Sequence, residues 1–206
     1  MTMEILPNFA VFEGGDGSGT STQLEKLKAR SLTPLFATFE PTNNPIGRLI
    51  RSSLRGEITI QRESLAYLFA ADRNEHVFGP GGIKERVKRG ELVICDRYVL
   101  SSLVYQGITC GEELPLKLNS VFPIPELLFF FDLNPEIAQK RMEGRVEKEI
   151  YESLDFQMLV WDRYRTLLPK FEKEGCRIEI IDASLPQEEV ALELWKVLQK
   201  MPILKG

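Results

Sequence analysis

The sequence contains little histidine or cysteine, and it has no excess of positive charge. Its 206 residues include one histidine and three cysteines, Cys95, Cys110 and Cys176, without CxxC spacing. An odd, scattered set of cysteines argues against a disulfide scaffold or a zinc site and is typical of a reducing compartment. The formal net charge is -4, whereas a sequence-independent grip on nucleic acid needs a basic face. We therefore expect no nucleic acid partner.

Long apolar runs are also missing. No run reaches the roughly 18 residues that a membrane-spanning helix needs. The first ten residues, MTMEILPNFA, are too few and too acidic for a secretory signal. These absences predict a cytoplasmic protein without a membrane partner. The length, and the lack of a repeat or of a linker rich in Gly, Ser or Pro, predict one domain over residues 1–206.

What the sequence does contain is an alternation of buried strands and amphipathic helices. Continuous apolar runs predict strands at 9–13, 35–39, 92–95, 126–133 and 177–182. Helical spacing predicts helices at 21–30, 61–77, 83–90, 135–144, 153–175 and 186–199. This alternation indicates the α/β class, a five-stranded parallel sheet flanked by helices on both faces. Ligands of such sheets bind at the carboxyl ends of the strands, which here carry a glycine loop, Glu40, Asp96-Arg97 and Asp182.

The glycine loop FEGGDGSGTSTQ (12–23) nearly matches a phosphate-binding loop. That motif reads Gly, any four residues, Gly, Lys, then Ser or Thr. Gly14, Gly19 and Ser21 fit the motif, but Thr20 stands at the lysine position. Glycines let backbone amides approach an anion, and the serine hydroxyl is placed to ligand Mg²⁺. The alternative is a glycine-rich surface turn. The candidate ATP-binding residues are Gly14, Gly15, Asp16, Gly17, Ser18, Gly19, Thr20, Ser21 and Thr22.

Further stretches resemble the thymidylate kinase family, within the P-loop nucleoside monophosphate kinases. They are LFAADRNEHV (68–77) and CDRYVLSSLVYQG (95–107), the latter being the most specific. FEGGDGSG fits apart from Thr20, and EP (40–41), PIGRLIR (45–51), PELLFFFDLNPEIAQKR (125–141) and IDA (181–183) follow in the family's order. The resemblance implies transfer of the γ-phosphate of ATP to dTMP with Mg²⁺, a short lid at about 142–155, and a homodimer.

The resemblance also implies roles for individual residues. Arg97 would bridge the donor and acceptor phosphates, while Asp96, together with Ser21, would hold the Mg²⁺. An ordinary ion pair at a strand end is the alternative for Asp96 and Arg97. Arg51 would grip the acceptor phosphate, with Arg48 as a weaker second candidate.

The remaining substrate contacts concern the sugar and the base. Asp16 would receive the 3′-hydroxyl, and Glu40 also belongs to the substrate-binding set. Phe69 and Arg73 are four residues apart and share a helix face, so the ring can stack on thymine while the guanidinium donates to a carbonyl oxygen. A core Phe beside a surface Arg is the alternative.

Three residues of the next helix complete the proposed nucleoside site. Ser101 and Gln106 would bond the base, and Tyr105 would crowd the 2′ position and exclude ribonucleotides. The single histidine, His76, lies near a Gly-Pro turn. We expect a capping or surface position for it and assign it no chemistry.

Four positions depart from the family pattern: Thr20 for the loop lysine, Phe39 for an arginine, Leu100 for an aspartate, and Ile150 for a lid arginine. Loss of a transition-state cation typically lowers a rate by about 10²–10³-fold. A lid cation would have to substitute, with Arg145 the first candidate and Arg141 and Lys148 the others.

Two alternatives to the dTMP kinase remain open at this point. One is a weak or inactive nucleotide-binding homologue, because the lysine is absent. The other is a deoxynucleoside kinase, although Arg51 and Arg73 favour a phosphorylated acceptor.

Overall fold

A five-stranded parallel sheet forms the centre of the protein. The computed structural model describes residues 4–30, 35–144, 149–201 and 203. The strands are β1 (Ile5–Gly14), β2 (Leu35–Phe39), β3 (Leu92–Asp96), β4 (Ile124–Asp132) and β5 (Arg177–Asp182). They lie in the order β2-β3-β1-β4-β5, and every pairing is parallel. The expected α/β class with a five-stranded parallel sheet is therefore confirmed.

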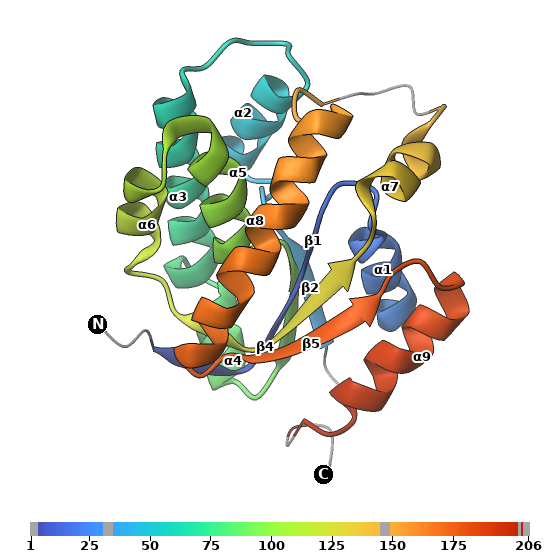
Figure 1. Cartoon of the computed structure of the whole chain (residues 1–206). Helices are drawn as coiled ribbons and strands as arrows, with labels where there is room; N and C mark the ends of the chain where they lie inside the picture. The colour runs from blue at the N-terminus through green and yellow to red at the C-terminus, as the bar shows by residue number, and fades with distance from the viewer. Residues whose placement is uncertain (1–3, 31–34, 145–148, 202, 204–206) are drawn as a thin grey trace.

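Helices cover both faces of this sheet (Figure 1). The helices are α1 (Thr20–Arg30), α2 (Pro45–Leu54), α3 (Arg62–Phe78), α4 (Ile83–Lys88), α5 (Val99–Cys110), α6 (Glu113–Asn119), α7 (Pro135–Met142), α8 (Leu154–Lys173) and α9 (Gln187–Leu198). One apolar core lies between the sheet and α4, α5 and α8, and a second between the sheet and α1 and α9. Burial on both faces explains why the strands read as continuous apolar runs.

The strand register brings the carboxyl ends of three strands to one point. Phe12 of β1 pairs with Asp96 of β3, which also pairs with Phe39 of β2. Immediately beyond these residues, the Arg97 amide donates to Phe12 O at 2.8 Å and the Glu40 amide donates to Asp96 O at 3.0 Å. The glycine loop, Glu40 and Arg97 consequently leave the sheet side by side.

Three helices were not assigned from the sequence: α2, α5 and α6. α5 is apolar on most sides, with Val99, Leu100, Leu103 and Val104 buried, so its sequence lacks the one-sided pattern of a surface helix. α2 begins at Pro45, where proline's missing N–H is no loss. α8 continues through Pro169 as expected.

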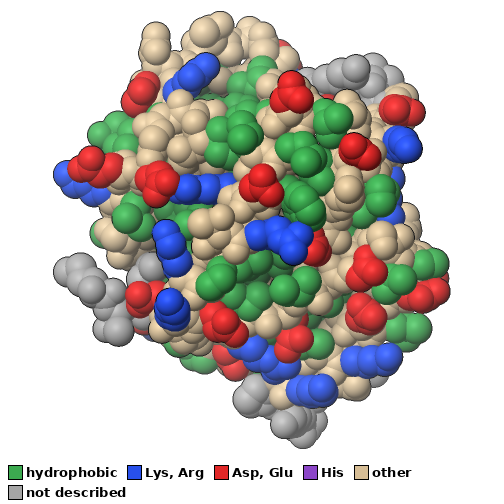
Figure 2. All heavy atoms as spheres, viewed as in Figure 1, with side chains coloured by type: hydrophobic (Ala, Val, Ile, Leu, Met, Phe, Trp, Pro, Cys, Tyr) green, Lys and Arg blue, Asp and Glu red, His purple; other side chains and the backbone are tan. Residues whose placement is uncertain are grey.

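The surface shows no concentration of one charge on the face drawn in Figure 2, where acidic and basic side chains alternate between apolar ones. Among the described helices, none combines the length and apolar character that crossing a bilayer would require. The three cysteines are free thiols.

Candidate active site

The glycine loop connects the buried end of β1 to the first turn of α1. Gly17 and Gly19 take φ angles of +80° and +94°, which other residues rarely adopt. A side chain at Gly14 is excluded by space, because its Cβ would lie 2.6 Å from Ser18 Oγ. Since α1 begins at Thr20, the amides of its first turn lack helical partners and are left for an anion. The backbone has the form that a phosphate cradle requires.

A cavity of about 330 Å³ opens beside this loop. Most of the residues expected to bind phosphate, metal or dTMP line it: Gly15, Asp16, Gly17, Gly19, Thr20, Ser21, Thr22, Glu40, Arg51, Phe69, Arg73, Asp96, Arg97, Ser101, Tyr105 and Gln106. Gly14, Ser18 and Arg48 do not line it, and Arg145 and Lys148 lie outside the described residues. The sequence-predicted set thus converges on one cavity, at the expected end of the sheet.

Ser21 and Asp96 meet at the base of the cavity. The serine hydroxyl donates to Asp96 Oδ2 at 2.5 Å. Asp96 is buried, and its Oδ1 has no hydrogen-bond partner in the described part of the chain. Leaving a buried carboxylate oxygen without a partner is costly, and Mg²⁺ prefers oxygen ligands of this kind. The two side chains therefore fit a hydrated Mg²⁺.

Arg97 reaches across the glycine loop from the end of β3. Its Nη2 lies 2.6 Å from Asp16 Oδ1, and its Nη1 donates to Gly14 O at 2.9 Å. The Tyr105 hydroxyl donates to the same Asp16 oxygen at 3.2 Å. Burial raises the pKa of Tyr105, so its hydroxyl keeps the proton that it donates. A fixed cation thus stands between the loop and the rest of the cavity.

Gln157, in the first turns of α8, clamps the glycine loop. Its Oε1 accepts from the Asp16 amide at 3.0 Å, and its Nε2 donates to Asp16 Oδ2 at 2.6 Å. The same Nε2 donates to Tyr151 O at 2.9 Å. One side-chain amide therefore joins the loop to the segment predicted as the lid. Sequence reasoning missed Gln157, because a glutamine in an amphipathic helix carries no signal of such a contact.

Arg73 is buried rather than on the surface, so the alternative of a surface arginine is wrong. Its side chain is 1% exposed, and its Nε and Nη2 lie 2.8 Å and 2.7 Å from Glu40 Oε2. Nη2 also donates to Ser102 Oγ at 3.1 Å, and Nη1 donates to Asn119 Oδ1. These partners fix the guanidinium at the cavity wall. Glu40 therefore acts as the anchor of Arg73, and neither Ser102 nor Asn119 was singled out from the sequence.

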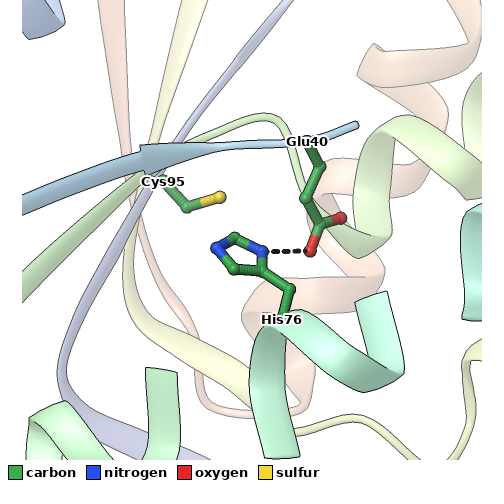
Figure 3. Close-up of side chains that lie close together, drawn as sticks. All are labelled: Glu40, His76 and Cys95. Atoms are coloured by element: carbon green, nitrogen blue, oxygen red, sulfur yellow. Dashed lines mark hydrogen bonds and ion pairs between the residues drawn. The ribbon is translucent and has the colours of Figure 1, made fainter. Parts of the chain in front are cut away.

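His76 is also buried, which corrects the expected capping or surface position. It projects from α3 toward Glu40 at the end of β2 (Figure 3). His76 Nδ1 lies 2.9 Å from Glu40 Oε1, and Nε2 shares a hydrogen bond of 2.7 Å with Thr38 Oγ1. The sequence did not indicate this burial, because the inner face of α3 mixes apolar residues such as Leu65 and Val77 with the polar Arg73 and His76.

Cys95 lies beside the same pair, so Glu40, His76 and Cys95 form a possible ligand group (Figure 3). We assign no metal to it. Both ring nitrogens of His76 already have partners, and Arg73 supplies the positive charge next to the carboxylate. Burial raises the pKa of Cys95, and its thiol donates to Arg97 O at 3.0 Å. A protonated thiol is a poor metal ligand.

The base-facing wall is formed by α3 and α5. Phe69 and Gln106 line it, and Gln106 Oε1 is buried without a hydrogen-bond partner in the described part of the chain. Ser101 also lines the cavity, and its hydroxyl donates to Glu13 Oε2 at 2.5 Å. A contact between Ser101 and the base stays a prediction.

Arg51 faces the cavity from α2 and stands over Phe39. Its Cζ lies 5.2 Å from the centroid of the Phe39 ring, a cation–π contact, and its Nη2 donates to Pro41 O. Its Nε is buried without a described hydrogen-bond partner. Burial lowers the pKa of Arg51, which still leaves a guanidinium charged. Arg48, by contrast, is exposed and donates to Asn43 O.

Of the lid segment between α7 and α8, the structure describes residues 143–144 and 149–153. Glu149, Tyr151 and Glu152 line the cavity. Ile150 is exposed, and its amide donates to Leu54 O of α2 at 2.9 Å. Tyr151 stacks on Phe156 with 4.9 Å between ring centroids. The described lid residues therefore bring carboxylates and aromatic rings, but no cation, to this cavity.

Arg141 points away from this cavity. Its Nη1 donates to Ala183 O at 2.9 Å and its Nη2 to Ser184 O at 3.3 Å, both in the loop after β5. It lines a second cavity of about 320 Å³, on the other side of the glycine loop, together with Thr22 and Gln23. The idea that Arg141 swings toward the transferred phosphate is not supported by this position.

The architecture and the cavity define a class. A parallel sheet in the order β2-β3-β1-β4-β5, with a glycine loop after its central strand and arginines around one cavity, is that of a P-loop nucleoside monophosphate kinase. The family model described as thymidylate kinase matches residues 12–194. The chain belongs to the thymidylate kinase family.

Individual relatives agree with this family. A protein named as a thymidylate kinase from Treponema pallidum is 41% identical over 189 residues, covering 90% of this chain and 91% of its own. One from Methanococcus maripaludis is 42% identical over 201 residues, covering 94% and 96%. The solved thymidylate kinase of Candida albicans superposes with a TM-score of 0.80 at 26% identity, over 96% of this chain and 93% of that one. These relatives favour the kinase over the two alternatives.

Proposed function

We propose that this protein transfers the γ-phosphoryl group of ATP to dTMP, giving ADP and dTDP. One observation carries the proposal: a single cavity contains the glycine loop, the Ser21–Asp96 pair and the guanidinium groups of Arg51, Arg73 and Arg97. Phosphoryl transfer depends on positioning and on neutralising the charge of the transferred group. An acceptor that itself carries phosphate explains why cations lie on both sides of the site.

On the acceptor side, each group has a partner in dTMP. Arg51, whose Nε has no hydrogen-bond partner within the described ranges, takes the phosphate, and Phe69 stacks on the thymine ring. Arg73 is held immobile by Glu40, so a remaining N–H can donate to a thymine carbonyl without further loss of side-chain entropy. Gln106 Oε1, to which no described residue donates, accepts from the N–H of the base. Tyr105 and Asp16 lie together where the sugar would sit.

Mg²⁺ is the metal that the Ser21–Asp96 pair fits. When bound, it neutralises charge on the donor phosphates. The Ser21 hydroxyl would turn from Asp96 toward the metal shell, and the unpartnered Asp96 Oδ1 would bond its water. Arg97 would then span from the glycine loop to the acceptor phosphate.

The adenine of ATP fits the second cavity. This cavity lies between Arg141 and the β5–α9 loop and touches Thr22 of α1. The planar Arg141 guanidinium is fixed by two carbonyl oxygens, which leaves its face open for stacking on a flat ring. Arg141 would thus contact the adenine base, whereas the sequence had made it a candidate for contacting the transferred phosphate.

A homodimer in the cytoplasm completes the proposal. α3 and α6 pack together and expose Tyr67 and Leu116, which are 57% and 55% exposed, so a second copy would bury an apolar patch that water now contacts. Three free thiols suit a reducing compartment. Light scattering at several protein concentrations tests the dimer.

The activity itself is tested by coupled detection of ADP. Purified protein is given ATP and Mg²⁺ with dTMP, with thymidine, or with no acceptor. We expect ADP release with dTMP alone. Release with thymidine but not dTMP would support the deoxynucleoside kinase. Tight binding of both nucleotides without turnover would support the inactive homologue.

A further inference from the structure

Glu13 is a buried carboxylate for which the reaction gives no direct use. It ends the apolar run of β1 and is 0% exposed. Its Oε1 accepts from the amides of Tyr98 at 2.9 Å and Ser101 at 3.2 Å. Its Oε2 accepts from Ser101 Oγ at 2.5 Å and Tyr164 Oη at 2.9 Å. Burying a carboxylate is expensive even with such partners, and desolvation raises the pKa of Glu13.

The turn that Glu13 holds contains an unusual backbone. Arg97 has a φ of +66°, a left-handed conformation that costs a side-chain-bearing residue roughly 1–2 kcal/mol. Such a conformation persists only where its surroundings determine it. The Arg97 amide is fixed by Phe12 O at 2.8 Å, and its carbonyl by the thiol of Cys95 at 3.0 Å. The next amide, that of Tyr98, is fixed by Glu13.

We propose that Glu13 is a positioning residue for phosphoryl transfer, which keeps Arg97 in its left-handed turn and so aims the guanidinium across the glycine loop. The side chain of Glu13 does not line the cavity, so it would not contact a substrate bound there. It acts through a geometry that places Arg97 Nη1 against Gly14 O and Nη2 against Asp16. The inference rests on the proposed kinase function, in which Arg97 contacts the phosphates.

A purely structural role makes a different prediction. Glu13 also bonds the first turn of α5 through Ser101, so its loss could simply weaken the fold. In that case the effect would appear in stability, and it would be independent of Arg97. A positioning role acts through Arg97 and disappears when that side chain is already absent.

A double-mutant cycle separates these roles. The variants are Glu13→Ala, Arg97→Ala and their combination, with Glu13→Gln as the conservative variant and Tyr164→Phe as the control. Glutamine Oε1 can still accept from the two turn amides, and Tyr164→Phe removes two bonds outside the turn, those of its hydroxyl to Glu13 Oε2 and Ser101 Oγ. We expect Glu13→Ala to lower kcat by about 100-fold with both KM values nearly unchanged. Glu13→Gln and Tyr164→Phe should stay within about 10-fold of wild type.

The decisive comparison is the double variant. If Glu13 acts through Arg97, the kcat of the double variant equals that of Arg97→Ala alone, because the effects of substituting two residues that act as a unit do not add. Full additivity, or a folded Glu13→Ala protein with wild-type kcat, would overturn the proposal. Should Glu13→Ala fail to fold, Glu13→Asp takes its place, because the shorter carboxylate cannot reach both Tyr98 and Tyr164.

A measurement that does not depend on turnover distinguishes failure of the proposed kinase function from failure of the positioning role of Glu13. If the wild-type protein releases no ADP with dTMP, the proposed function is wrong, and the position of Arg97 is then followed by NMR of its Nε–H group. A shift of that signal in Glu13→Ala, restored in Glu13→Gln, supports the positioning role. An unshifted signal overturns it.

Discussion

Ser21 and Asp96, 75 residues apart in the sequence, share a hydrogen bond of 2.5 Å that joins the start of α1 to the end of β3. The bond closes the phosphate loop against the strand that carries Arg97. It also leaves the second carboxylate oxygen of Asp96 buried and without a hydrogen-bond partner among the described residues. The pair is thus ready for a metal without rearrangement of the backbone.

Replacing Asp96 by Asn should abolish most Mg²⁺-dependent turnover. The amide keeps the shape but lacks the charge that holds the hydrated ion, so we expect kcat to fall by about 10²-fold or more while dTMP affinity changes little. Mg²⁺ titration of the rate and calorimetry with dTMP measure the two quantities. Asp162→Asn, at an exposed position of α8 outside both cavities, is the control. An unchanged Mg²⁺ dependence in Asp96→Asn would place the metal elsewhere.

Base and sugar selectivity should follow the α3–α5 wall. Calorimetry should rank dTMP above dCMP, dGMP and dAMP by about 1–3 kcal/mol, the range for leaving a buried hydrogen-bonding group unpaired. Tyr105→Ala should admit UMP, whereas Tyr105→Phe keeps the ring and should still exclude it. Equal affinity for all four deoxynucleotides would refute a thymine site, and continued exclusion of UMP by Tyr105→Ala would remove the 2′ filter.

Loss of the His76 imidazole should weaken thymine binding indirectly, through Glu40 and Arg73. In His76→Phe one oxygen of the buried Glu40 carboxylate has no partner, so unfolding should become easier by about 1–3 kcal/mol. Because Glu40 anchors Arg73, KM for dTMP should rise more than KM for ATP. Steady-state kinetics and denaturant unfolding test this. Asn74→Ala, at an exposed position on the same helix, is the matched control; equal KM values in the two variants would dissociate His76 from substrate binding.

The stability of the protein should depend on pH through the ionisation of Glu13. Its folded pKa is raised, so its stabilising contribution is complete below the unfolded value of about 4.3 and is lost as pH rises through the folded value. Glu13→Gln does not ionise, so its Tm relative to wild type should increase as pH rises above the unfolded value of about 4.3. Glu75→Gln, exposed on α3, is the control. A relative Tm that is flat with pH would contradict the raised pKa.

Thr20 should limit turnover more than ATP binding. Amides alone cradle the β-phosphate, but the neutral hydroxyl gives a hydrogen bond about half as strong as a charge-assisted one. We propose that Arg145 supplies the missing charge, so Arg145→Ala should lower kcat by roughly 10²-fold or more. Thr20→Lys in that background should restore part of the rate, and Thr20→Ser is the control. A silent Arg145→Ala, with a large gain from Thr20→Lys in wild type, would show that no substitute exists.

Much of the fold and of the cavity could be predicted because both depend on local patterns. Five apolar runs became five strands, and the order of sheet and helices placed Glu40, Asp96 and Arg97 at one edge. The site residues found this way lie on the loops directly after strands, or on one face of a helix. Those positions are fixed by chain connectivity and periodicity alone.

What the sequence did not reveal are contacts between distant elements. Gln157 meets Asp16 across 141 residues, and Tyr164 meets Glu13 across 151. His76 was expected at the surface because it lies near a Gly-Pro turn, yet its ring contacts Glu40 and Thr38. One signal was present: Glu13 is a charged residue inside the apolar run FAVFE, and an interior charge demands partners.

The position of β1 in the sheet has a consequence for folding during synthesis of the chain. β1 is made first, but its neighbours are β3 and β4, so one of its edges lacks its native partner until β3 is made, and the other until the chain has grown to Asp132. During that time Phe9, Val11 and Phe12, which are fully buried in the folded protein, have no complete sheet to enter. Late pairing of distant strands slows folding and leaves unpaired strand edges that promote aggregation. The nascent chain should therefore depend on chaperones, and a fragment that stops before β4 should aggregate instead of forming half of a nucleotide site.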